Sequence, residues 1–63
     1  MRIAEAIKSA QAEATEHGIN ILVTYNPYAE EADSRERYGY HPESAKHIFK
    51  YETAVSLITP ENE

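Results

Sequence analysis

The first third of the chain carries a hydrophobic pattern with the period of an α-helix. One face of that period holds apolar residues at spacings of four, three and four: Ile3, Ile7, Ala10 and Ala14. Ala6 widens this face, and Gly18 follows at the position where a left-handed residue often ends a helix. The pattern predicts an amphipathic helix over residues 2–17.

Residues 19–26 show the two-residue alternation of a β-strand. One side of the alternation is wholly apolar or aromatic, with Ile19, Ile21, Val23 and Tyr25. The other side is mixed, with Asn20, Leu22, Thr24 and Asn26. Pro27 cannot donate a backbone hydrogen bond, so regular pairing is expected to stop near Asn26.

Residues 46–58 fit two interpretations. As a strand, a predominantly apolar set alternates with a mostly polar set: Phe49, Tyr51, Thr53, Val55 and Leu57 against Lys50, Glu52, Ala54 and Ser56. As a helix, Ile48, Tyr51, Val55 and Ile58 form a stripe that leaves out Leu57. We favour a strand over 47–58, because residues 19–26 need a backbone partner. Residues 1–59 then form one domain, followed by an acidic tail, 60–63, that is expected to fray.

The middle of the chain, residues 27–45, is ambiguous. A short helix would have Asn26 as N-cap, Pro27 at its first position and two charge pairs, Glu31 with Arg35 and Asp33 with Arg37. The other interpretation is a turn, a short strand over 37–41 and a second turn at 42–44, which completes a three-stranded meander. We favour the meander slightly. The predicted fold is therefore α+β, with the N-terminal helix packed on a small antiparallel sheet.

The composition makes a lone copy of this chain marginally stable. It has 63 residues, and nine of its hydrophobic residues are alanine. A chain this short buries a small share of its surface, and without Cys it has neither disulfides nor thiolate zinc sites. We therefore expect a homodimer, formed through an edge strand or a tyrosine-bearing face, or a surface that a partner completes.

Several classes of function are disfavoured. No apolar run approaches the length of a membrane span, and residues 1–5 lack the apolar core of a signal peptide, so a cytoplasmic protein is expected. The three His are widely spaced, and we expect no metal and no cofactor. With two Gly and no nucleophile or phosphate-loop motif, the chain is predicted not to be an enzyme.

A cluster of tyrosines and acidic residues is the favoured partner-binding surface. Tyr supplies rigid, amphipathic contact area, and an acidic patch can occupy a basic groove on a protein that handles nucleic acid. The alternative is a purely structural role, in which these tyrosines cover a thin core and the acidic residues form a solvated face. The candidate residues are Tyr25, Tyr28, Glu30, Glu31, Asp33, Glu36, Tyr38 and Tyr40.

The alternative is a small nucleic-acid-binding module. Basic and aromatic side chains alternate in the segment that contains Arg35, Arg37, Tyr38, Tyr40 and His41. Segment 30–37 has a net charge of −2 and the chain −5, which would repel phosphates, so nucleic acid is the less favoured partner.

The favoured function is a small acidic interaction protein, an inhibitor or assembly factor that binds a larger protein. In size, acidity and lack of Cys the chain resembles small accessory proteins encoded by phages and mobile elements.

Overall fold

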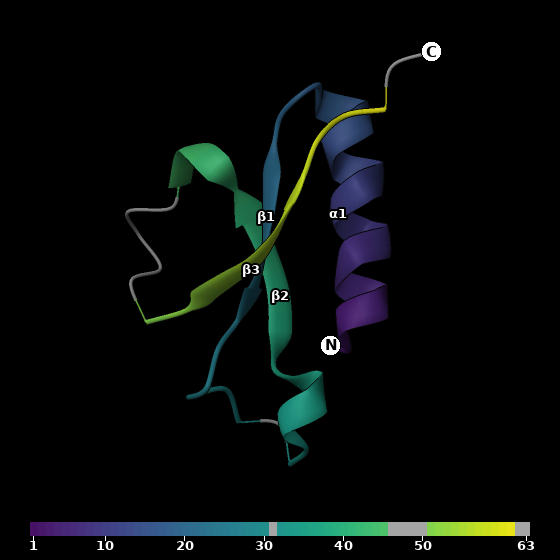
Figure 1. Ribbon diagram of the computed structural model, residues 1–63. Coiled ribbons are helices and arrows are strands. Elements are labelled where there is room, and N and C mark those ends of the chain that lie inside the picture. Colours follow the sequence, from purple (N-terminus) through teal and green to yellow (C-terminus); the bar gives the residue numbers. More distant parts are fainter. Residues whose placement is uncertain (31, 46–50, 62–63) are drawn as a thin grey trace.

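The computed structural model describes residues 1–30, 32–45 and 51–61 (Figure 1). One helix packs on one face of a three-stranded antiparallel sheet, which confirms the predicted α+β class. Two single turns of 3₁₀-helix, η1 (Ser34–Glu36) and η2 (Glu43–Ala45), flank the second strand. The main elements are α1 (Ile3–His17), β1 (Ile21–Tyr25), β2 (Tyr38–Pro42) and β3 (Thr53–Ile58).

Helix α1 begins and ends close to where the sequence predicted. Gly18 ends it in the left-handed conformation, at φ 64°, and its backbone N–H donates to the carbonyl of Ala14. A residue with a Cβ would be strained at this φ, which is why glycine terminates so many helices.

The buried face of α1 differs from the predicted one. Three alanines, Ala6, Ala10 and Ala14, are completely buried, whereas Ile3 and Ile7 are 41% and 38% exposed. The helix lies mainly over β1 and β2 and makes less contact with β3, and the sheet covers the two isoleucines only in part. The prediction that Ile3 and Ile7 belong to the buried stripe was therefore wrong.

The sheet has the order β2-β1-β3, so it is not the sequential meander that the sequence suggested. Strand β3 lies on the far side of β1 from β2 and pairs with β1 antiparallel. The central strand is the one that is buried on both faces: Ile21 and Val23 face α1, while Thr24, on the opposite face, is also completely buried.

Strand β3 begins later than predicted and is irregular. Tyr51 and Glu52 lie in a turn and a bend before it, and residues 47–50 of the predicted strand lie outside the described residues. Its register with β1 shifts by one residue between Val23 and Thr24, which leaves Val55 as the extra residue of a β-bulge. The predicted alternation was therefore wrong: Leu57 is exposed, whereas Ser56 and Ile58 pair with β1 residues that face α1.

The segment between β1 and β2 does not form the helix that was the second interpretation. Asn26 Oδ1 accepts from the Tyr28 N–H in a tight turn, and Asp33 caps η1 by accepting from the Arg35 N–H. Asp33 therefore pairs with Arg35 instead of Arg37, and the proposed partner Glu31 lies outside the described residues. The predicted strand over 37–41 is confirmed as β2, one residue later.

After β3 the chain passes back along α1. The carbonyl of Thr59 accepts from Gln11 Nε2, and the Glu61 N–H donates to Thr15 Oγ1. Among the described residues, no helix is both long and apolar enough to cross a membrane.

Candidate functional site

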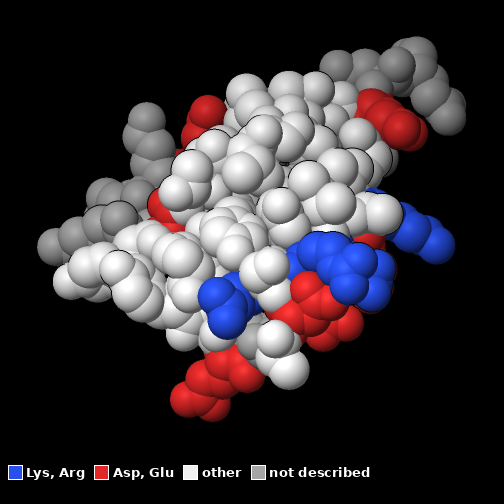
Figure 2. All heavy atoms as spheres, turned by 60° about the horizontal axis from the view of Figure 1, so that its bottom comes forward, with Lys and Arg blue, Asp and Glu red and all other residues white. Residues whose placement is uncertain are grey.

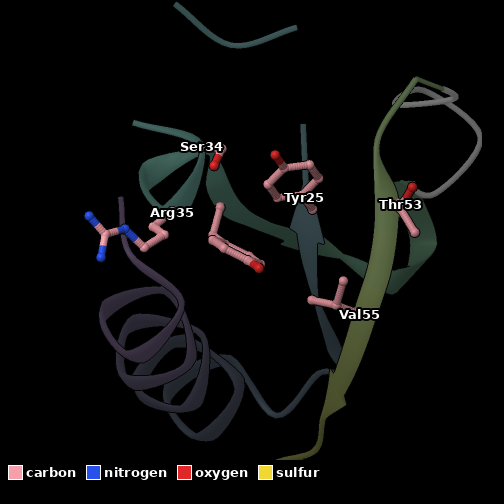
Figure 3. Close-up of a pocket in the computed structure, with 6 residues that line it drawn as sticks. Tyr25, Ser34, Arg35, Thr53 and Val55 are labelled. Carbon is pink, nitrogen blue, oxygen red and sulfur yellow. The ribbon is translucent and has the colours of Figure 1, made fainter. Parts of the chain in front are cut away.

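The helix side of the sheet is hollowed at the end where β1 finishes and β2 starts (Figure 3). The hollow measures about 370 Å³ and is a shallow depression, widely open to solvent. We call it the tyrosine hollow and define it by the residues that line it: Tyr25, Ser34, Arg35, Tyr38, Thr53 and Val55.

The register of the sheet positions the two tyrosines of this hollow. Tyr25 and Tyr38 are directly opposite on β1 and β2, at a pair whose backbone groups do not bond each other. Side chains approach most closely at such pairs. The two ring centroids are 5.1 Å apart at an interplanar angle of 60°, an edge-to-face contact. This contact holds both rings in place before any partner binds.

The β-bulge supplies the third apolar wall. An extra residue in one strand bends that strand and redirects its side chains. Val55 is that residue, and it lies on the same side as Tyr25, across the hollow (Figure 3). The pairing of β3 with β1 confirms that residues 47–58 supply a partner for residues 19–26. The sequence analysis nevertheless missed Val55, Thr53 and Ser34 as site residues, because a bulge leaves no periodic signal.

The charged rim of the tyrosine hollow is largely neutralised within the chain. Arg35 Nη2 lies 2.7 Å from Asp33 Oδ2, and its Nε also donates to that carboxylate. This guanidinium, followed by the Arg35 backbone N–H, holds the pKa of Asp33 below its usual range, and the carboxylate raises the pKa of Arg35. Glu36 Oε1 lies 3.9 Å from Arg2 Nε. Figure 2 shows positive and negative side chains interleaved here, beside a broad uncharged surface.

The predicted acidic surface is therefore only partly assembled. Glu30 is exposed, Asp33 and Glu36 have basic neighbours in the same chain, and Glu31 lies outside the described residues. A carboxylate that is already paired attracts a basic partner less strongly than a free one.

The remaining tyrosines lie elsewhere. Tyr40 packs against the buried core. Tyr28 is exposed beyond the end of β1 and meets Tyr51, which the prediction left out, with ring centroids 6.3 Å apart and planes at 90°. These two rings and Asn26 line a second open hollow of about 360 Å³.

The residues of the nucleic-acid alternative do not form one surface. Tyr38 and Tyr40 lie on the helix side of β2, and His41 lies on the opposite face because strand residues alternate. Arg37 donates to the carbonyl of Pro27, and its Nε is buried without a hydrogen-bond partner. Of the two arginines, Arg35 is the more accessible, and it is paired with Asp33.

A polar cluster on the face opposite α1 escaped the sequence analysis. The Thr24 hydroxyl donates to Glu52 Oε1 at 2.8 Å, and His41 Nε2 lies 3.1 Å from the same oxygen. The hydroxyl and the imidazole therefore share one oxygen of the Glu52 carboxylate. Among the described residues no group of three potential ligands could hold a metal ion.

Comparison of the chain with protein-family models, with curated proteins and with solved structures finds no match.

Proposed function

We propose that this protein is a non-enzymatic interaction protein that binds a larger protein through the tyrosine hollow. It would act as an inhibitor or assembly factor by occupying a surface of that partner. The absence of Cys fits a partner in the reducing cytoplasm.

The observation that carries the proposal is the edge-to-face pair of Tyr25 and Tyr38 at the wall of an open hollow. Tyrosines held in place by packing lose little conformational entropy on binding, and aromatic residues are enriched at protein interfaces. The hollow accepts an apolar side chain of the partner, such as Leu, Met or Phe, between Tyr25 and Val55.

Charge contributes to the approach of the partner more than to its anchoring. The net charge of −5 favours encounter with a basic surface. Because Asp33 and Glu36 already have basic neighbours, binding through the hollow should depend less on salt than binding through phosphates or an acidic patch.

The experiment is a pull-down with tagged protein from bacterial lysate, with and without nuclease, in which the wild type is compared with two variants. Ser34→Trp places an indole at the wall of the hollow, at an exposed position. Ser44→Trp makes the same change at an exposed position in η2, which does not line the hollow. We expect a stoichiometric partner that survives nuclease, is lost with Ser34→Trp and is retained with Ser44→Trp.

Two outcomes overturn the proposal. Equal capture by both variants would place the binding surface away from the hollow. Capture that disappears with nuclease and also with Arg35→Glu would favour the nucleic-acid module instead.

A further inference from the structure

The outer edge of β2 is obstructed at both of its ends. The bonds from Asn26 N–H to the Arg37 carbonyl and from Glu43 N–H to the Asn20 carbonyl fix which pairs of β1 and β2 are hydrogen-bonded. Because such pairs alternate along an antiparallel ladder, the backbone groups of residues 38, 40 and 42 point away from β1. The Tyr38 N–H already donates to the carbonyl of Met1, and Pro42 has no N–H.

The outer edge of β3 is different. Leu57 pairs with Leu22, whose own backbone groups bond toward β2, so the N–H and carbonyl of Leu57 point away from the sheet. In the part of the chain that the structure describes, no strand lies beyond β3. An edge of this kind is a template for another strand.

The side chains of β3 also favour a second copy over other occupants. Residues 53–58 carry no charge in a chain of net charge −5. Two copies that meet at this strand therefore bring no like charges directly opposite each other, although most of their remaining surface repels. Two apolar side chains of this strand are exposed, Val55 at 44% and Leu57 at 49%.

We propose that two copies of this protein pair through β3, antiparallel, to form a continuous six-stranded sheet. An antiparallel seam of two identical strands has a two-fold axis perpendicular to the sheet. Both α1 helices therefore lie on the same face of the joined sheet. Val55 contacts the second copy on that face and Leu57 on the other, so each face gains apolar contacts at the seam.

The seam is short, and this sets the expected strength. The bulge at Val55 leaves Ser56–Ile58 as the regular part of the edge. A pairing of this length belongs among small interfaces, and we expect a dissociation constant of about 10–100 μM. Val55 of β3 also lines the tyrosine hollow, but the dimer does not require the partner proposed for that hollow.

The experiment is sedimentation equilibrium of purified protein from about 5 to about 500 μM, a range chosen to bracket that constant. Leu57→Lys puts one lysine from each copy at the paired strands, where the two positive charges oppose pairing. The core is unchanged, since Leu57 is exposed. Tyr28→Lys is the matched control, at an exposed position outside the sheet. We expect dimerisation at least about tenfold weaker with Leu57→Lys and unchanged with Tyr28→Lys.

A second measurement locates the seam, because the chain has no Cys of its own. Single substitutions Ala54→Cys, Val55→Cys, Leu57→Cys and Tyr28→Cys are oxidised at about 100 μM. We expect the cysteines in β3 to form a disulfide-linked dimer, with the highest yield at the position where the two copies bring their cysteines closest. Tyr28→Cys should give little covalent dimer.

Three results would overturn the proposal. They are a monomer throughout the concentration range, a dimer that survives Leu57→Lys, and crosslinking that is strongest at Tyr28→Cys. None of these measurements involves the partner of the tyrosine hollow, so either proposal can fail while the other stands.

Discussion

Thr24 is completely buried although it lies on the mixed side of its strand. Its hydroxyl donates to Glu52 Oε1 at 2.8 Å, across 28 positions of the chain, and the carboxylate also meets His41. A half-buried carboxylate is costly unless donors compensate for the water it loses. Thr24 is therefore a structural donor that holds Glu52 in place just before β3 begins.

We expect Thr24→Val to lower the free energy of unfolding by about 1–3 kcal/mol, because the shape is kept while the carboxylate loses a donor. Urea denaturation followed by circular dichroism measures this. Thr53→Val is the control, since Thr53 lies in a strand but is exposed. Equal stability of the wild type and Thr24→Val would mean that water replaces the lost donor.

This contact could not have been predicted from the sequence. The alternation of residues 19–26 correctly separated Thr24 from Ile21 and Val23, but it could not say which side chain would cover Thr24. That depends on the pairing of β3 with β1, which brings Glu52 close.

At the scale of elements, α1 packs on the sheet through three alanines, Ala6, Ala10 and Ala14. Small side chains let the helix lie close to β1 and β2, so there is no room for a larger residue in the contact. Ile3 and Ile7 of the same helix are exposed and are not part of this buried contact.

We therefore expect Ala10→Leu to destabilise the fold by about 1–3 kcal/mol, because the added side chain forces the helix off the sheet. Ala12→Leu is the matched control on the exposed side of α1, where leucine and alanine differ little in helix propensity. Thermal unfolding of the two variants gives the comparison. If Ala10→Leu and Ala12→Leu had the same melting temperature, the alanine face would not be a tight contact.

Elements whose signal is local were the ones that the sequence predicted well. The period of α1, its end at Gly18 and the existence of β1 and β2 depend on neighbouring residues, and each was confirmed. The order of the strands and the bulge at Val55 depend on how β3 meets β1, and both were missed. The tyrosine hollow was half predicted for the same reason: Tyr25, Arg35 and Tyr38 were candidates, whereas the wall from β3 was not.

At the scale of the whole molecule, the core is thin. The completely buried hydrophobic residues among those described are three alanines, Ile21 and Val23. A domain of this size keeps a small margin of stability even when it is well packed. The dimer proposed through β3 would therefore add to a small margin of stability.

We expect the melting temperature to rise with protein concentration between about 5 and about 500 μM, since association stabilises the folded form by mass action. Differential scanning calorimetry at several concentrations measures the effect. Leu57→Lys should remove the dependence while the protein still unfolds cooperatively. A melting temperature independent of concentration in the wild type would show that the folded monomer needs no second copy.

The alanine face of α1 has a consequence for the lifetime of the protein in a cell. A fold with so small a core unfolds more often than a well-packed domain, and proteases remove chains in the unfolded state. Whatever binds the folded form lowers the unfolded fraction and slows degradation. With the partner proposed for the tyrosine hollow, copies in excess of that partner should be degraded faster than bound copies, so the amount of the two proteins would be linked.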